Sequence, residues 1–205
     1  MNKIYRSLLL LLMLVSLNSC LLTLFPIYTE KEVVFHPELL GYFKKINEDK
    51  IEEWMIIQPL SEYKGKLTPG LAAIKNKGYL VSFSDKEKSN PNQFIAFSPR
   101  LGNGLYMDFA PLHKAERDPA YESMRIPMHA VYRIRDLNKN GFLLHRFSSG
   151  FLSGLIERKK IRISNEYLNG QAVITASTAE LQDYINKYGH VEDAYESKPE
   201  TYRKK

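Results

Sequence analysis

After residue 31 the chain alternates apolar and polar side chains over most of its length, with the period of two that is typical of β-strands. Strands are predicted at 41–45, 51–60, 78–85, 93–101, 104–111, 127–137, 142–148, 161–164 and 171–177. The run 32–36 is either a first strand or an extended approach to the next one. Turn sequences at 102–104 and 138–141 separate neighbouring runs and predict antiparallel hairpins.

Alternation also sorts side chains onto two faces of each strand. In the run 51–60, Trp54 and Ile56 share one face, and Met55 and Ile57 share the other. A second long run, 127–137, places four apolar residues on one face: Met128, Ala130, Tyr132 and Ile134.

Two later segments change to the helical period. Residues 149–160 place Leu152, Leu155 and Ile156 on one stripe and end in basic residues. The second helix begins with a capping box from Ser177 to Glu180 and runs to about Tyr188. Its apolar stripe has the i, i+3, i+4, i+7 spacing and consists of Leu181, Tyr184, Ile185 and Tyr188. Gly189 is placed to end this helix in the left-handed conformation.

These patterns predict a mainly β, α+β fold: an antiparallel sheet of about eight or nine strands, curled into a barrel or sandwich, with C-terminal helices. The expected domain is a single β-rich unit at 32–190, and residues 191–205 are expected to be a charged flexible tail.

Composition agrees with a β-rich domain, since the 205 residues include 13 Tyr and 10 Phe. The formal net charge is +6, but most basic residues are interleaved with acidic ones, which indicates a solvated surface and no nucleic-acid partner. The clusters 158–160 and 203–205 are exceptions. They have two interpretations: solubility, or contact with anionic lipid head groups.

The first twenty residues have the organisation of a secretory signal. Lys3 and Arg6 precede the apolar run 7–17, and the only cysteine of the chain, Cys20, follows. The segment Leu17-Asn18-Ser19-Cys20 resembles the lipobox of bacterial lipoproteins. The resemblance implies that 1–19 is removed as a signal peptide, that Cys20 is acylated, and that 20–31 is a lipidated tether.

Two other interpretations of the N-terminus stay open. In the first, Cys20 is an ordinary buried thiol. In the second, residues 7–25 form an uncleaved membrane helix, since nineteen residues at a rise of 1.5 Å span roughly 28 Å, close to the thickness of a bilayer core. For a lipoprotein, Leu21 is not the aspartate linked to retention in the inner membrane, and no acidic cluster follows Cys20. By resemblance, this favours the outer membrane of the cell envelope, facing the periplasm.

Two further resemblances concern the exported part. Gly41-Tyr42-Phe43 looks like the start of a lipocalin-like barrel, although the diagnostic tryptophan of that family is missing. The stretches 26–30 and 175–182 are similar to those of small uncharacterised envelope lipoproteins, a resemblance that implies no activity.

No catalytic constellation is recognisable in the sequence. Zinc-binding spacing, phosphate loops, dinucleotide fingerprints and nucleophile elbows are all missing from the sequence, so we expect no enzyme, no cofactor and no metal site. Asp108 interrupts an apolar strand, on the same face as Tyr106. It is expected to point to solvent or to cap a neighbouring group.

The function expected from the sequence is that of a lipid-anchored binding module. Five aromatic residues are candidates for lining an apolar ligand site inside the sheet: Trp54, Phe83, Phe94, Tyr106 and Tyr132. The same residues would also serve simply to fill a core. The alternative function is that of an accessory or scaffold lipoprotein that contacts an envelope protein through the 112–126 loop or the C-terminal helix. The expected partners are thus membrane lipid through acylated Cys20, and an apolar small molecule or an envelope protein.

Overall fold

The computed structural model describes residues 21–46, 53–85, 92–112, 128–168 and 171–205. Within them a single sheet contains β1 (Leu21–Thr23), β2 (Gly41–Ile46), β3 (Glu53–Pro59), β4 (Gly78–Asp85), β5 (Asn92–Phe97), β6 (Arg100–Leu101), β7 (Gly104–Pro111), β8 (His129–Asn138), β9 (Gly141–Arg146), β10 (Asn165–Leu168), β11 (Gln171–Ile174) and β12 (Glu200–Lys204). The α-helices of the described part are α2 (Pro69–Ala73), α4 (Ser149–Glu157) and α5 (Thr178–Tyr188). Short 3-10 turns are η2 (Pro37–Leu39), η3 (Leu60–Glu62), η4 (Lys75–Lys77) and η5 (Glu192–Ala194). The predicted fold class, mainly β with a few helices, is confirmed.

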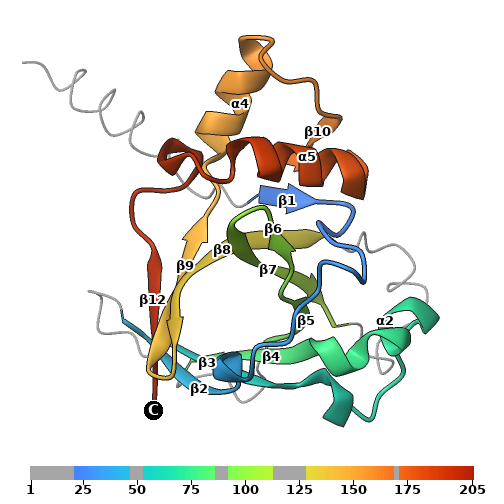
Figure 1. The fold of residues 1–205 in the computed structure, drawn as a ribbon, viewed down its shortest axis with the longest axis vertical. Helices are drawn as coiled ribbons and strands as arrows, with labels where there is room; N and C mark the ends of the chain where they lie inside the picture. Colours follow the sequence, from blue (N-terminus) through green and yellow to red (C-terminus); the bar gives the residue numbers. More distant parts are fainter. Residues whose placement is uncertain (1–20, 47–52, 86–91, 113–127, 169–170) are drawn as a thin grey trace, which may run out of the picture.

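Eight of the strands close into an antiparallel barrel (Figure 1). In chain order these are β2, β3, β4, β5, β7, β8, β9 and β12, and each pairs with the next one. The last strand, β12, also pairs with β2 and thereby closes the ring. Closure gives each strand a hydrogen-bonding partner on both sides, which removes the exposed edges of an open sheet.

The interior of the barrel is filled at one end by apolar side chains. Phe43, Met55 and Met107 point inward and are fully buried there. The turn η2 covers this end, because Leu39 belongs to the same buried cluster. The Tyr79 hydroxyl at the start of β4 accepts a hydrogen bond of 2.6 Å from the His36 N–H, which ties the segment before η2 to the barrel.

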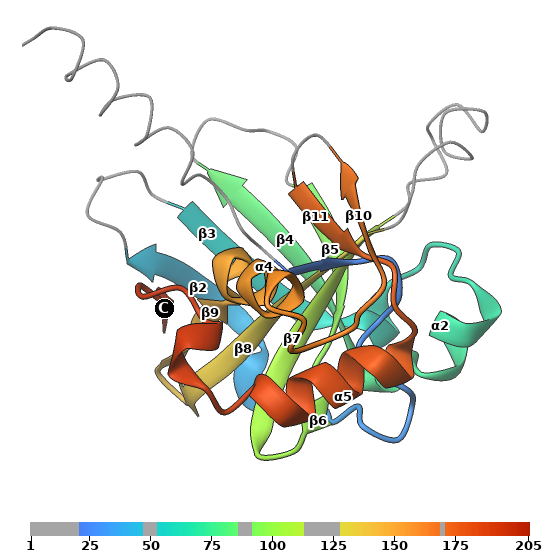
Figure 2. The same ribbon diagram turned by 90° about the horizontal axis from the view of Figure 1, so that it is seen from above.

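A second apolar cluster lies outside the barrel, on one side of it. There α4, α5 and the strands β1, β11 and β10 are packed together (Figures 1 and 2). Leu21, Leu152 and Tyr184, from β1, α4 and α5, are all buried in this cluster. The molecule therefore has two cores, one inside the barrel and one between the barrel wall and this outer layer.

The helix α5 has the predicted start, stripe and end at Tyr188, but Gly189 does not have the predicted left-handed conformation. Ser177 and Glu180 form a complete capping box, and Leu181 and Tyr184 are buried. Gly189, however, is right-handed, with φ of −65°. A glycine is needed there for space, because a Cβ would lie 2.3 Å from the Tyr106 hydroxyl oxygen.

The predicted tether is wrong for its described residues. Residues 21–23 form β1, which pairs with β8 and β11, and Ile27 and Tyr28 are buried. Pro26 does not prevent this packing, because it lies beyond the three-residue strand. Residues 21–28 therefore belong to the folded body.

The predicted flexible tail is also wrong. Residues 200–204 form β12, and the Tyr202 side chain is buried within the barrel. A flexible tail was predicted because Tyr202 is the only strongly apolar residue in the charged stretch 200–204. One inward apolar side chain is nevertheless enough, because β12 pairs with β9 on one side and with β2 on the other.

Two strand predictions differ in detail. The run 93–101 is divided into β5 and β6 at Pro99, which has no N–H for a continuous ladder. Residues 161–164 are not a strand, and β10 begins at Asn165 instead.

Candidate functional site

The barrel is open at the end opposite η2, where a cavity of about 320 Å³ lies among its inward side chains. All eight barrel strands contribute to its wall. The lining residues are Lys45, Glu53, Phe83, Asn92, Phe94, Phe109, Ala130, Tyr132, Leu144, Arg146, Glu200 and Tyr202. This volume is at the lower end of the range for small-molecule pockets, roughly 300–1,000 Å³.

Four aromatic rings form one apolar wall of this cavity. The centroid of Phe109 lies 5.6 Å from that of Tyr132 and 6.0 Å from that of Phe83. Phe83 and Phe94 meet edge to face at 5.5 Å. Such contacts hold each ring in place, so the wall is formed without a ligand.

The opposite wall is ionic. Lys45 Nζ lies 2.9 Å from a carboxylate oxygen of Glu53 and 3.5 Å from one of Glu200. The second Glu200 oxygen contacts the Arg146 guanidinium. The Tyr202 hydroxyl donates to Glu200 over 2.9 Å. Burial, together with the Glu200 carboxylate, raises the pKa of Tyr202, which stays protonated as a donor.

Two cations and two carboxylates therefore balance each other at the open end. Glu200 is the centre of this network, since it contacts Lys45, Arg146 and Tyr202. A polar group that entered the cavity would find both donors and acceptors, while an apolar group would contact the rings. The arrangement is suited to binding a molecule with both apolar and polar parts.

The five predicted lining residues divide into two groups. Phe83, Phe94 and Tyr132 line the cavity together. For Trp54 and Tyr106 the prediction is wrong. Trp54 is on the outer wall of the barrel, with the ammonium groups of Lys44 and Lys205 over its ring.

Tyr106 lies outside the barrel as well, buried in the cluster under α5. Alternation gives two faces for each strand but does not say which face is inside. In β3 the inward face belongs to Met55 and Ile57, so that Trp54 points outward. In β7 it belongs to Met107 and Phe109, so that Tyr106 points outward.

The ionic residues of the site were missed by sequence reasoning. Each of them extends an inward apolar face by one more step of two residues: Lys45 follows Phe43, Glu53 precedes Met55, and Arg146 follows Leu144. That spacing was a usable signal. It was overlooked because charged residues at strand ends are usually solvated.

Asp108 is buried, with 1% of its surface exposed, and lies outside the barrel. Of the two positions expected for it, solvent is wrong and the capping position is confirmed. One carboxylate oxygen accepts the Ile27 N–H over 2.9 Å. The other is 2.6 Å from His129 Nδ1, which donates to it. Asp108 thus attaches the segment after β1 to β7 and β8.

Cys20 and the signal 1–19 lie outside the described residues, as do residues 113–126 of the predicted loop. In the part of the chain that the structure describes, no helix has the length and apolar character needed to cross a membrane. Nor do His, Cys, Asp and Glu side chains gather into a metal-binding group among these residues.

Comparison of the chain with protein-family models, with curated proteins and with solved structures found no match.

Proposed function

We propose that this chain is a lipid-anchored protein of the cell envelope whose barrel binds a small apolar or amphipathic molecule at its open end. The observation that carries this proposal is the cavity of about 320 Å³. Its aromatic wall favours an apolar group, and its balanced ionic wall favours a polar end that both donates and accepts hydrogen bonds.

The filled end of the barrel limits the size of the ligand. Phe43, Met55 and Met107 occupy the deep part, so the ligand reaches only the outer half. A compact molecule, or one end of a longer chain, fits this depth. A ligand with a single net charge would have to disturb the contacts of Glu200 with Lys45 and Arg146.

Anchorage through acylated Cys20 rests on the lipobox resemblance and on the position of the folded body. Leu21, the residue next to Cys20 in the sequence, already belongs to the folded body. Two or three acyl chains on one residue would make release from the membrane negligible. The same resemblance supports the outer membrane, facing the periplasm, as the location.

The alternative, an accessory protein that docks a partner through the C-terminal helix, is less well supported. The apolar stripe of α5 is already used, because Leu181, Tyr184 and Ile185 are buried against the rest of the molecule.

Ligand binding is tested with a fluorescent apolar probe, N-phenyl-1-naphthylamine, titrated into the full-length protein. Ala130→Leu places extra atoms in the cavity and should weaken binding roughly tenfold, about 1.4 kcal/mol. Ala110→Leu is the matched control, because Ala110 does not line the cavity. Equal affinity of both variants and wild type would overturn the assignment of the site.

A second measurement searches for the natural ligand. Native mass spectrometry of the protein from its own host should show a co-purified small molecule that Ala130→Leu loses. Anchorage is checked separately with labelled palmitate, which should enter wild type but not Cys20→Ser; equal labelling contradicts it.

A further inference from the structure

We propose that the surface at the end of α4 binds an anionic phospholipid bilayer and seats the molecule on it. This surface, the α4 groove, is lined by Ile156, Lys159, Ile161, Arg162, Ile163, Ser164 and Glu180. It is distinct from the barrel cavity, and none of its residues lines that site.

The groove has an apolar base and a cationic rim. Its volume is about 570 Å³, and three isoleucines form its apolar part. Lys159 and Arg162 are exposed beside them, and Lys160 is exposed next to Lys159. Apolar side chains surrounded by cations complement the boundary between acyl chains and anionic head groups.

The cations of the groove are not used within the described part of the chain. No ion pair there involves Lys159, Lys160 or Arg162. A different cation contacts the C-terminal end of α4, since Arg158 Nε donates to the Gly154 carbonyl over 2.9 Å. Glu180, the acidic residue of the groove, accepts hydrogen bonds from the Ser177 N–H and hydroxyl, which lower the pKa of its carboxyl group.

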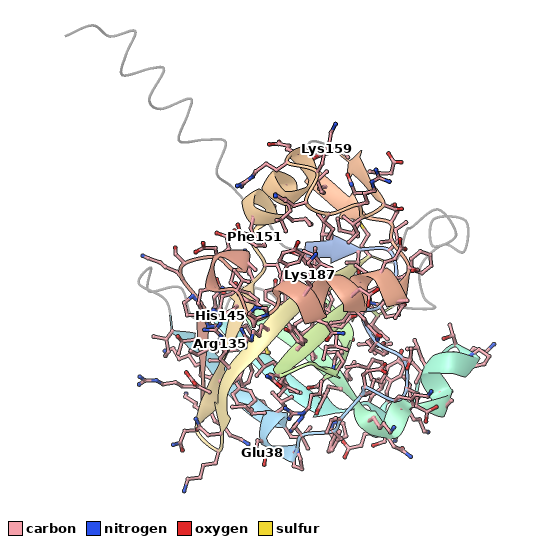
Figure 3. All side chains as sticks on the ribbon, turned by 45° about the horizontal axis from the view of Figure 1, so that its top comes forward. Glu38, Arg135, His145, Phe151, Lys159 and Lys187 are labelled. Carbon is pink, nitrogen blue, oxygen red and sulfur yellow. The ribbon has the colours of Figure 1, made fainter. Side chains whose placement is uncertain are left out.

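Lys159 has a backbone conformation that favours glycine. Its φ is +55°, and the N–H groups of Lys159 and Lys160 bond back to the carbonyls of Ile156 and Leu155 to end α4. A lysine in this left-handed position is less stable than a glycine. The sequence nevertheless places an ammonium there, at the outer tip of the molecule and far from Glu38 (Figure 3).

The position of the groove relative to the membrane follows from β1, and this step rests on the proposed anchor. An acylated Cys20 would bring the membrane to within one residue of Leu21, whereas a membrane helix over 7–25 does not fit β1, which occupies Leu21–Thr23. Leu21 is 5% exposed and shares an apolar cluster with Leu152 of α4 and Ile163 of the groove. No flexible linker therefore separates Leu21 from the rest of the described folded body.

A short path of backbone contacts connects β1 with the groove. Thr23 is paired with Ile174 of β11, and the N–H of the next residue, Thr175, donates to the Ser164 carbonyl over 2.8 Å. The bilayer next to Leu21 thus lies beside the α4 groove. Each basic residue near an anionic surface favours binding about fivefold to tenfold, so three of them contribute roughly 100-fold or more.

The test uses tryptophan fluorescence of the full-length protein reconstituted in vesicles. In a Trp54→Phe background, Ile161→Trp places a reporter in the groove. Trp54 of the wild type, on the outer barrel wall, is the control reporter. Brominated lipids in vesicles of phosphatidylcholine with about 30% phosphatidylglycerol should quench the groove reporter and leave Trp54 unquenched.

The charge dependence decides the result. Adding Lys159→Ala, Lys160→Ala and Arg162→Ala should reduce quenching of the groove reporter to the level found in pure phosphatidylcholine. Equal quenching in both vesicle types, or no effect of the three substitutions, would overturn the proposal. Flotation of the protein with the vesicles in every sample reports the anchor independently, so that failure of the groove and failure of the anchor are distinguished.

Discussion

At the scale of single residues, Asp108 connects three parts of the structure. It belongs to β7, accepts from His129 of β8, and accepts from the Ile27 N–H in the segment after β1. The carboxylate is 1% exposed, so each of these partners would be left unsatisfied by its removal.

Asp108→Ala should therefore lower the free energy of unfolding by about 1–3 kcal/mol for each buried donor that loses its acceptor. Asp108→Asn should have a smaller effect, because its amide oxygen can still accept from Ile27. Urea unfolding of the full-length protein measures both. Asp183→Ala, at an exposed position of α5, is the control and should change stability by less than about 0.5 kcal/mol.

Buried tyrosines make the stability sensitive to alkaline pH. Burial raises the pKa of Tyr79 to about 12, with an increase from Glu38 opposed by a hydrogen bond to His36. The folded state keeps the Tyr79 proton between pH 10 and 12, while the unfolded chain loses it. This contribution is therefore complete below about pH 10 and decreases by about 1.4 kcal/mol per pH unit up to pH 12.

Tyr79→Phe should reduce this loss. The variant is less stable than wild type at pH 8, because the His36 N–H loses its acceptor. Its stability should nevertheless fall less steeply between pH 10 and 11. Tyr42→Phe is the control, since Tyr42 is 60% exposed. Urea unfolding at both pH values gives the slopes, and equal slopes for Tyr79→Phe and wild type would contradict the prediction.

At the scale of elements, the sequence was sufficient to predict structure that depends on contacts between residues close together in the chain. The capping box of α5 was predicted because Ser177 and Glu180 act over three residues. β12 was not, because its stability comes from two neighbouring strands, and these lie far away in the sequence. β1 was missed for the same reason: three residues become a strand only when β8 and β11 pair with them.

For the candidate site as well, the sequence predicted which residues of a strand share a face, but not which face points into the barrel. Alternation grouped Ala130 with Tyr132 correctly, and both line the cavity. It does not say which face of β3 is inside, so the sequence prediction placed Trp54 in the interior that Met55 occupies. The inward direction is decided by the closure of the whole barrel, which no single strand encodes.

The cap of α5 gives a prediction at this scale. Ser177→Ala removes the acceptor of the Glu180 N–H and should cost about 1 kcal/mol at pH 7. Hydrogen bonds from Ser177 lower the pKa of Glu180, so the Glu180 contribution is present above its unfolded value of 4.5 and is lost as the pH falls below it. The effect of Ser177→Ala should therefore decrease at pH 3.

The measurement is thermal denaturation at both pH values. Ser153→Ala, the same change in the middle of α4, should be neutral or slightly stabilising, because alanine is the better helix former. An unchanged Ser177→Ala effect at pH 3 would show that the reciprocal bond from Glu180 contributes little.

At the scale of the whole molecule, the barrel cavity and the α4 groove are close along the chain. Arg146, the last residue of β9, lines the cavity, and α4 begins at Ser149. β1 pairs with the start of β8, where Ala130 lines the cavity. Seating of the α4 groove on a bilayer would therefore bring the open end of the barrel near the lipid, where an amphipathic ligand is concentrated.

The closing strand links this architecture to the site, because β12 both completes the barrel and supplies Glu200 and Tyr202. Deletion of residues 200–205 should open the ring between β9 and β2. Loss of the buried Tyr202 side chain alone costs about 3–5 kcal/mol, a large share of a typical stability of about 5–15 kcal/mol. The deletion variant should therefore unfold at much lower urea concentration and lose binding of the naphthylamine probe.

Arg203→Ala, an exposed position of the same strand, keeps the backbone pairing and should change neither property. A flexible tail would give the opposite result: its removal would leave stability and probe binding as they are in the complete chain.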